Sequence, residues 1–445
     1  MNVTLQQILR ARDARAERQQ TLLSGLGRPL LSFCMNIPGP VKDSPLIRRC
    51  FRTGLSALRE WELPLLSWDE RYEPTGPELL CAVDMDARTL KNICLSLEDG
   101  APVGRLFDMD VIDSDGKRLS RDEARPCLVC GAPGRGCASR RLHPPEQLQA
   151  AVKTLMEEHF LWHDRERVEA LVTRALTDEL ETTPKPGLVD RSNNGSHRDM
   201  DRETFAASIR ALRLFWGRCF FIGAATAGDP PAESFRLLRQ EGLEAERTML
   251  AATDGVNTHK GAVFLLGAVC GATGRLWSAE EPCRDPERIA AECAAMSREA
   301  IEADFAALRA SGSGRSAGED IYLRLGLRGA RGELADGLPS VLCCALPALQ
   351  SLLSAGHSRN DAGVAVLLRL IARGGDTNMI RRGGPETAAA AAQEAAALIA
   401  RREQPDPSDV EALDRSFIAR NLSPGGCADL LSVSFFLHDW ALPEP

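Results

Sequence analysis

The chain has little tyrosine and no long apolar run: two tyrosines occur among its 445 residues. No stretch approaches the roughly twenty consecutive apolar residues that a membrane-spanning helix needs, so the sequence predicts no membrane partner. Residues 1–18 alternate charges and lack the apolar core of a signal peptide. These absences favour a cytoplasmic protein.

The chain also has no excess of positive charge, and its formal net charge is -8. A chain of this sign is not expected to have nucleic acid as its main partner, although local arginine clusters can still hold the phosphates of a small ligand. The apolar fraction of 44% and the charged fraction of 26% are typical of a globular protein. Fourteen cysteines in a large chain without an export signal indicate buried, reduced thiols rather than disulfides.

The two halves of the chain differ in their patterns, and the change lies near His143-Pro144-Pro145. Residues 1–145 combine short alternating runs with turns, which predicts an α+β domain with a small mixed sheet. Helices are expected at two places in this half, Leu5–Leu23 and Arg48–Trp61. Strands are expected at Leu30–Ile37, Glu78–Asp84, Lys91–Leu97 and Gly104–Ile112.

Residues 146–445 read as an all-α domain without strands. Asp285 before Pro286 is a typical helix start, with an N-cap residue ahead of proline at the first helical position. The apolar side chains that follow lie on one helical face. They are Ile289, Cys293, Met296 and Ala300.

Three polar loops interrupt the helical half: Thr183–Asp201, Thr253–Gly261 and Gly374–Asn378. The first contains Pro184 and Pro186, which exclude a helix interior because proline lacks the donor and fixes φ. Loops of this kind hold polar groups where binding and catalysis concentrate. Together the three predict a single nucleotide site.

These loops, followed by Ser423-Pro-Gly-Gly-Cys-Ala-Asp-Leu430, resemble the triphosphoribosyl-dephospho-coenzyme A synthases of citrate lyase and malonate decarboxylase maturation. The resemblance covers roughly residues 165 to 440. It implies that ATP loses adenine and that the 2'-hydroxyl of dephospho-coenzyme A attacks the vacated anomeric carbon, while the 5'-triphosphate is retained. Departure of adenine builds positive charge on the ribose, which carboxylates stabilise, and the hydroxyl proton needs a base.

Candidate residues for this chemistry follow from their types. His197, His259 and Glu246 are the candidates for proton transfer, and the sequence does not show which of them is the base. Asp201 and Asp254 are the candidates for stabilising the charge on the ribose. Asp199 and Asp376 are the candidates for binding a magnesium ion on the triphosphate. The residues expected to bind ATP or dephospho-coenzyme A are Lys185, Gly187, Lys260, Asn257 and Asn378.

In the first half, Asp108 and Asp110 lie two apart in a predicted strand. Residues i and i+2 of a strand point to the same face, so both carboxylates can bind one metal while Phe107, Met109 and Val111 face a core. Paired aspartates of this kind suit metal-assisted phosphoryl or nucleotidyl transfer.

This segment resembles the holo-citrate lyase synthase family over about residues 5 to 143. The supporting motifs are Arg12-Asp13, Pro38–Asp43, Ser120-Arg121 and the cysteine cluster that begins at Cys127. The resemblance implies transfer of phosphoribosyl-dephospho-coenzyme A to a serine of the acyl carrier (gamma) subunit, with release of diphosphate. It also implies magnesium on Asp108 and Asp110, and phosphate contacts from Lys42, Arg105 and Arg121.

Cys127, Cys130, Cys137 and His143 have a spacing compatible with a structural zinc ion. The alternative is a set of reduced thiols beside a surface histidine. The C-x-x-C pair is suggestive, whereas the longer gaps that follow are not a standard zinc pattern.

Taken together, the sequence predicts a bifunctional transferase of citrate lyase maturation. One half makes 2'-(5''-triphosphoribosyl)-3'-dephospho-CoA from ATP and 3'-dephospho-CoA, and the other attaches it to the carrier. Two alternatives stay open. The same synthesis could serve malonate decarboxylase, or the N-terminal half could be only a zinc-stabilised module that docks the carrier.

Overall fold

The computed structural model describes residues 2–121, 125–132, 137, 140 and 142–443. It divides into an N-terminal unit, formed mainly by residues 1–163, and a C-terminal unit, formed by residues 164–277 and 282–444. Helix α5 (Pro145–Glu181) begins at the predicted boundary, and the division between the units falls inside it. Within the described residues, no helix combines the length and apolarity needed to cross a bilayer.

The N-terminal unit contains one five-stranded sheet with the order β2-β3-β1-β4-β5. Every pairing in it is antiparallel, so the prediction of a mixed sheet was wrong. A tight turn joins β2 to β3, and strands joined in this way must run in opposite directions. The strands are β1 (Leu30–Met35), β2 (Leu65–Glu73), β3 (Gly76–Val83), β4 (Phe107–Ile112) and β5 (Arg118–Leu119).

The sequence predicted a strand at Lys91–Leu97, and this prediction was wrong. The segment is part of helix α3 (Ala87–Gly100). The alternation of apolar residues there was misleading, because Asp86 caps the helix by accepting a hydrogen bond from the Thr89 backbone N–H at 2.9 Å. The side chains that are actually buried recur at helical spacing, at Leu90, Ile93 and Cys94.

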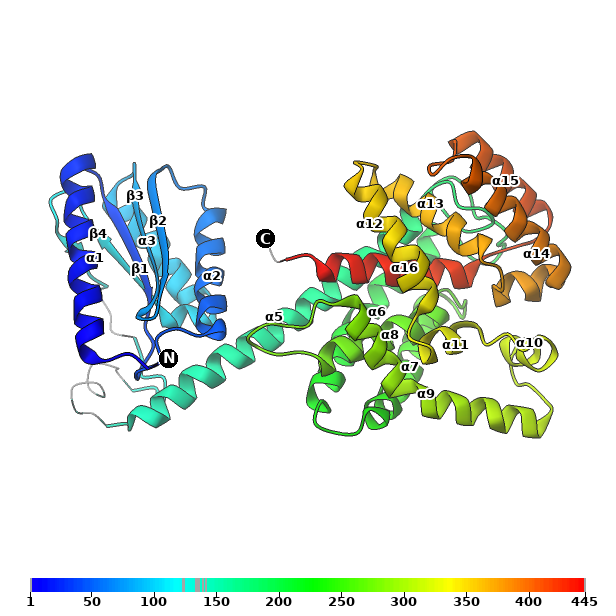
Figure 1. Ribbon diagram of the computed structural model, residues 1–445, viewed down its shortest axis with the longest axis horizontal. Coiled ribbons are helices and arrows are strands. Elements are labelled where there is room, and N and C mark those ends of the chain that lie inside the picture. Colours follow the sequence, from blue (N-terminus) through cyan, green and yellow to red (C-terminus); the bar gives the residue numbers. More distant parts are fainter. Residues whose placement is uncertain (1, 122–124, 133–136, 138–139, 141, 444–445) are drawn as a thin grey trace. The chain divides into compact units, whose positions relative to one another are not determined.

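The two faces of the sheet carry different helices (Figure 1). Helices α2 (Pro45–Glu60) and α3 cover one face, where Phe33 of β1 stacks on Phe51 of α2 with ring centroids 4.7 Å apart. Helix α1 (Leu5–Leu26) covers the other face, with Leu22 and Leu23 packed against the apolar end of the sheet. The opposite end of this α1 face carries charged side chains.

From residue 145 onward the described residues form helices and no strand. The predicted helix start at Asp285-Pro286 is confirmed, since Asp285 accepts a hydrogen bond from the Glu287 N–H at 2.9 Å. After α5 come α6 (Arg202–Ala225), α7 (Pro231–Ala252), α8 (Lys260–Arg275), α9 (Pro286–Ser311), α10 (Ala317–Leu325), α11 (Gly329–Ala335), α12 (Leu346–Ser354), α13 (Arg359–Ala372), α14 (Thr377–Arg401), α15 (Pro407–Ala419) and α16 (Gly425–Ala441).

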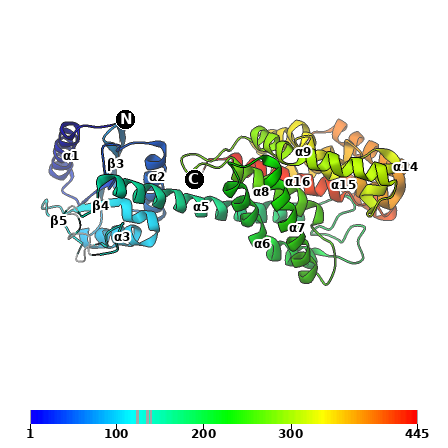
Figure 2. The same cartoon turned by 90° about the horizontal axis from the view of Figure 1, so that it is seen from below.

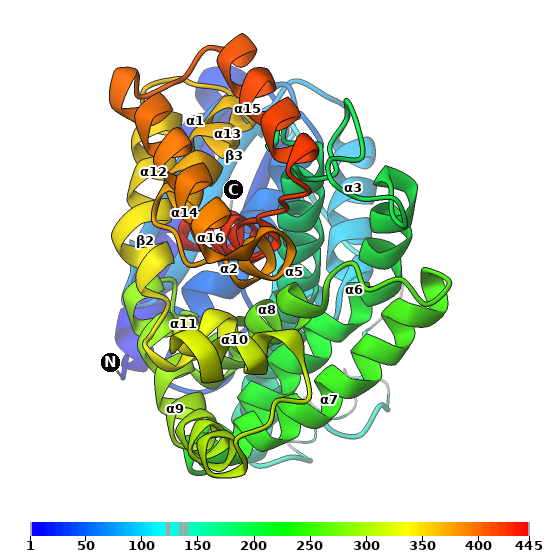
Figure 3. The same cartoon turned by 90° about the vertical axis from the view of Figure 1, so that its right-hand side faces the viewer.

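Helices α6, α7 and α8 are neighbours in the C-terminal unit (Figure 2). Helices α6 and α8 approach closely because glycines face backbone: a β-carbon on Gly223 would lie 1.9 Å from the Gly271 carbonyl oxygen, and one on Gly274 would lie 2.0 Å from that of Phe220. Helices α13, α14 and α15 gather on the side of α16 away from α7 (Figure 3). Because α8 and α16 are buried along most of their length, they form the centre of this unit.

Candidate functional site

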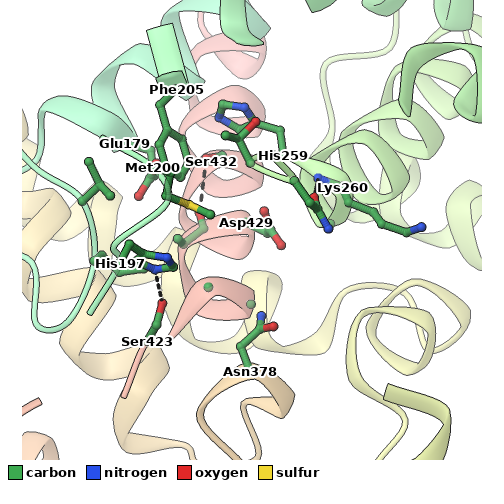
Figure 4. Close-up of a pocket in the computed structure, with 18 of the residues that line it drawn as sticks. Glu179, His197, Met200, Phe205, His259, Lys260, Asn378, Ser423, Asp429 and Ser432 are labelled. Carbon is green, nitrogen blue, oxygen red and sulfur yellow. Dashed lines mark hydrogen bonds between the residues drawn. The ribbon is translucent and has the colours of Figure 1, made fainter. Parts of the chain in front are cut away.

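A cavity of about 480 Å³ lies in the C-terminal unit, where the three predicted polar loops meet (Figure 4). Its walls come from the end of α5, the loop of residues 182–201, and the first turns of α8, α14 and α16. Segments far apart in the sequence therefore contribute to one site.

The loop of residues 182–201 is held by carboxylates that accept backbone hydrogen bonds. Asp190 accepts from the N–H groups of Lys185, Ser192 and Asn193 at 2.6–3.0 Å. Asp414 of α15 accepts from the Gly187 N–H at 2.8 Å. Gly187 has φ of 70°, and a β-carbon there would lie 2.2 Å from the Leu422 carbonyl oxygen, so this position requires glycine.

Three helices present their N-termini to the cavity. The residues before α8 and α16, His259 and Pro424, make no cap with their own side chains. Asn257 accepts a hydrogen bond from the Lys260 N–H of α8 at 3.3 Å, and Asp376 accepts one from the Cys427 N–H of α16 at 2.9 Å. The first backbone N–H groups of such helices, together with the helix dipole, form a ready site for an anion. Gly425 and Gly426 line the cavity at the start of α16, where they leave the backbone open to a ligand. The third helix, α14, contributes Thr377 and Asn378.

Cationic side chains surround these helix ends. Arg381 and Arg382 of α14 line the cavity just before Gly384, whose φ of 80° interrupts the helix. Arg382 donates hydrogen bonds to the Ser196 carbonyl oxygen at 2.8 Å and to Asn421 at 3.0 Å. Lys185 is 1% exposed, and its Nζ lies 2.6 Å from a carboxylate oxygen of Glu179. The cavity can therefore hold a polyanion.

His197 is held at both ring nitrogens. Nδ1 accepts a hydrogen bond from Arg382 at 3.1 Å, so the proton sits on Nε2, which donates to the Ser423 hydroxyl at 2.9 Å. Burial, followed by the charge of Arg382, lowers the pKa of His197 to about 4. The ring is therefore neutral at pH 7, and neither nitrogen is free.

His259 has one free ring nitrogen. Nδ1 lies 2.7 Å from the Ser208 hydroxyl, whereas Nε2 is buried without a hydrogen-bond partner. The imidazole is 3% exposed and packs edge-on against Phe205. Burial, followed by the charge of Lys185, lowers the pKa of His259 to about 3. With the proton on Nδ1, the lone pair of Nε2 is available to accept another.

Asp429 of α16 points into the middle of the cavity (Figure 4). Burial, followed by the negative charges of Glu179 and Asp376, raises the pKa of Asp429 well above its usual value. A β-carbon on Gly261 would lie 1.9 Å from its Oδ2, so this glycine lets the carboxyl group approach the start of α8. Asp429 therefore keeps its proton to a higher pH than an exposed aspartate does.

Seven of the twelve residues predicted for this site line the cavity. These are Lys185, His197, Asp199, Asn257, His259, Lys260 and Asn378. The other five, which lie outside it, are Gly187, Asp201, Glu246, Asp254 and Asp376.

Structural contacts account for several of the residues outside the cavity. Asp201 caps α6 through the Thr204 N–H at 2.9 Å, and Asp376 caps α14. Asp254 is exposed in a turn, with φ of 51°. Glu246 forms an ion pair at 2.8 Å with Lys260, whose side chain extends away from Asp429 (Figure 4).

The sequence reading missed four charged residues of the cavity: Glu179, Arg381, Arg382 and Asp429. The sequence contained a signal for Asp429 and for the two arginines. Asp429 belongs to the motif that begins at Ser423, and the two arginines follow Asn378 by one turn of helix. Glu179 belongs to the long helix α5 and has no local signal.

In the N-terminal unit, β4 places Asp108 and Asp110 on the α1 face of the sheet. Their neighbours Phe107, Met109 and Val111 are buried on the opposite face, as predicted. Burial, followed by the charge of Asp110, raises the pKa of Asp108. Two carboxylates that repel each other in this way suit a divalent cation, which would offset the repulsion.

Other polar groups share this face. Cys34 of β1 pairs in register with both Asp108 and Glu78, which places the three side chains in one row. Arg15 of α1 donates a hydrogen bond to Glu78 at 2.6 Å. The α1 face therefore carries carboxylates and a guanidinium group at one end of the sheet.

The predicted phosphate-binding cations lie near the ends of this sheet. The Lys42 ammonium donates to the Ile37 carbonyl oxygen, and Arg105 donates to that of Pro126. Arg121 forms ion pairs with Glu98 at 3.1 Å and with Asp99 at 2.9 Å. Burial, followed by the charges of Arg125 and Arg121, lowers the pKa of Arg105, so an anion would relieve the repulsion among these arginines.

Cys127, Cys130, Cys137 and His143 come together in the structure. Their ligand atoms all lie within 4.8 Å of one another. The Sγ atoms of Cys130 and Cys137 are 3.4 Å apart, and His143 Nε2 lies 3.3 Å from Cys130 Sγ. Tetrahedral coordination with bonds of about 2.3 Å to sulfur and about 2.0 Å to nitrogen requires separations of this size.

Two family models match the chain. One, described as ATP:dephospho-CoA triphosphoribosyl transferase (CitG), matches residues 165–443. The other, described as apo-citrate lyase phosphoribosyl-dephospho-CoA transferase (CitX), matches residues 3–159. The CitX match ends and the CitG match begins inside α5.

Curated proteins are similar to the whole chain or to about two thirds of it. "Protein CitXG" from Haemophilus influenzae is 33% identical and covers 98% of this chain and 96% of its own length. "Protein CitXG" from Leuconostoc mesenteroides subsp. cremoris is 31% identical and covers 98% of this chain and 97% of its own length. The 2-(5''-triphosphoribosyl)-3'-dephosphocoenzyme-A synthase of Pectobacterium atrosepticum is 40% identical and covers 67% of this chain and 97% of its own length.

The buried histidines predict how stability depends on pH. In the unfolded chain a histidine has a pKa near 6.5, above the folded values for His197 and His259. Between pH 6.5 and about 4 the unfolded state therefore binds more protons. The free energy of unfolding should fall with decreasing pH by up to about 1.4 kcal/mol per pH unit for each histidine.

Chemical denaturation from pH 7 to pH 4.5 measures this slope. We expect His197→Gln to reduce the slope, whereas His357→Gln, at an exposed position, should leave it unchanged because that side chain is hydrated in both states. An unchanged slope in His197→Gln would show that this histidine is not held neutral by the fold.

Proposed function

The chain belongs to the family of fusions that join an apo-citrate lyase phosphoribosyl-dephospho-CoA transferase to an ATP:dephospho-CoA triphosphoribosyl transferase, and we propose how its residues divide the two reactions. The protein makes triphosphoribosyl-dephospho-CoA from ATP and dephospho-CoA, then transfers phosphoribosyl-dephospho-CoA to apo-citrate lyase. Both resemblances stated from the sequence are confirmed. The match of residues 3–159 favours citrate lyase over malonate decarboxylase.

We assign the first reaction to the cavity of the C-terminal unit. The observation that supports this most strongly is the free Nε2 of His259 beside a cluster of helix N-termini and arginines. In the proposed arrangement the triphosphate of ATP lies against the starts of α8 and α16, with Arg381 and Arg382 on its other side. The ribose then lies between His259 and Asp429.

His259 is the proposed general base. Its Nε2 takes the proton of the dephospho-CoA 2'-hydroxyl as that oxygen bonds to the anomeric carbon of ATP. The bond from this carbon to adenine breaks at the same centre. Asp429, whose pKa is raised by burial, donates its proton to the departing adenine. Opposite pKa shifts in one cavity are typical of an acid and base pair.

A magnesium ion fits the cavity as a counter-ion of the triphosphate. Magnesium is usually held by one or two carboxylates together with substrate phosphates. Asp199 is the best candidate, because it lines the cavity and is 66% exposed. Asp376 is a weaker candidate, since both of its oxygens already accept backbone hydrogen bonds.

A His259→Asn variant tests the base. The asparagine amide can replace Nδ1 in its contact with Ser208 but has no atom at the position of Nε2. We expect kcat for adenine release to fall about 10²- to 10⁴-fold, because general base catalysis contributes about this factor. Binding of ATP and dephospho-CoA should change little. A kcat within threefold of wild type would exclude His259 as the base.

We assign the second reaction to the α1 face of the N-terminal sheet. Asp108 and Asp110 would hold magnesium, and Lys42, Arg105 and Arg121 would contact the phosphates. A serine hydroxyl of the acyl carrier subunit attacks the phosphorus next to the ribose, and the bond from this phosphorus to the diphosphate breaks. The hydroxyl proton is released and a phosphodiester is formed.

An Asp108→Asn variant separates this reaction from the first. Transfer to the carrier should fall at least about 100-fold, since one of two metal-binding carboxylates is removed while side-chain volume is kept. Adenine release should equal that of wild type and serves as an internal control for folding. Full transfer in this variant, measured as the mass gain of the carrier, would support the N-terminal half as a docking module.

We further propose that Cys127, Cys130, Cys137 and His143 bind a structural zinc ion. Arg125, two residues before Cys127, donates hydrogen bonds to the carbonyl oxygens of Arg105 and Phe107, both at 3.0 Å. The site would thus fasten this segment beside the start of β4, next to Asp108.

Elemental analysis of the purified protein should find about one zinc per chain. Cys130→Ser should lower this content and weaken carrier transfer, whereas Cys343→Ser, at another exposed cysteine, should change neither. Wild-type protein without zinc, and unable to take it up after reduction, would contradict the assignment.

A further inference from the structure

A second, largely apolar groove of about 420 Å³ adjoins the cavity described above. Phe235, Leu238 and Leu243 of α7 form one wall, and Val263 and Phe264 of α8 form another. None of these side chains has a place in the proposed reaction. An apolar groove beside a reaction site needs a ligand that is itself partly apolar.

The groove and the cavity share a wall. Lys260, Gly261 and Ala330 line both of them. Lys260 follows the proposed base directly in the sequence, and its side chain extends away from Asp429 (Figure 4). A ligand can therefore occupy both spaces at once, passing the start of α8.

Cations stand along the apolar walls, and each one is paired with a carboxylate. Arg239 lies 3.1 Å from Asp304, and Lys260 lies 2.8 Å from Glu246. Arg331 also lines the groove. The side chains of Arg239 and Lys260 are 48% and 59% exposed, so they can also contact a phosphate in the groove.

On this basis we propose that the groove binds the phosphopantetheine arm of dephospho-CoA, a proposal that rests on the function assigned above. The apolar walls would hold the pantetheine chain, and Lys260 and Arg239 would contact the diphosphate. The attached ribose then reaches the shared wall with its 2'-hydroxyl near His259. ATP has no such arm, so the groove distinguishes the acceptor from the donor.

Gly242 offers a way to close the groove without disturbing the cavity. It lines the groove within α7, and the nearest atom to an added β-carbon is Val263 Cγ1 at 3.9 Å. Leucine is also a better helix former than glycine, so Gly242→Leu should fold. Gly318→Leu is the matched control, because this exposed helical glycine has no neighbour within 4 Å of an added β-carbon.

Steady-state kinetics of adenine release tests the proposal. For Gly242→Leu we expect the KM for dephospho-CoA to rise at least tenfold, with the KM for ATP within twofold of wild type. In wild type, 4'-phosphopantetheine should compete with dephospho-CoA and not with ATP, and this inhibition should weaken in the variant. Gly318→Leu should behave as wild type.

Two outcomes would overturn the assignment of the groove. One is an unchanged KM for dephospho-CoA in Gly242→Leu, and the other is a rise confined to the KM for ATP. Both presuppose adenine release by wild type. Absence of that release in a folded sample would instead contradict the proposed function itself.

Discussion

The candidate site of the C-terminal unit depends on one buried carboxylate, Asp376. Its Oδ1 accepts hydrogen bonds from the Asn378 and Met379 N–H groups at the start of α14, and its Oδ2 accepts one from the Cys427 N–H at the start of α16. One side chain thereby joins two helix N-termini at the cavity. A β-carbon on Gly426 would lie 2.9 Å from Oδ2, so glycine there permits the contact. Removal of this carboxylate would leave buried N–H groups without partners.

Around this junction, the ionisable side chains of the cavity differ in charge because their local surroundings differ. Arginines and helix N-termini favour an anion, while burial lowers the pKa of His259 and raises the pKa of Asp429. His197 is also neutral but is bonded at both nitrogens, which suits a positioning role for Arg382 and the loop. Burial therefore keeps both histidines neutral, but their different hydrogen bonds suit them to different roles.

The sequence could predict the features that depend on local patterns. The alternation around Asp108 and the helix start at Asp285 follow from short-range rules, whereas the prediction that three polar loops form one site came from their shared composition. The sequence could not distinguish Asp376 as a cap from Asp429 as a cavity residue, because that difference arises only when α14 and α16 meet. Likewise, Lys91–Leu97 alternates like a strand, but the cap at Asp86 and the burial of Leu90 and Cys94 make it a helix.

The central claim is that one chain makes a nucleotide intermediate and then consumes it, which raises the effective concentration of that intermediate for its user. The most direct test incubates the wild-type protein with ATP, magnesium and dephospho-CoA, and follows adenine and the triphosphoribosyl product by mass spectrometry. Adding the apo carrier subunit then tests the second step. We predict adenine release that requires dephospho-CoA, followed by a carrier mass gain equal to phosphoribosyl-dephospho-CoA. A folded protein that releases no adenine with any divalent metal would contradict the account.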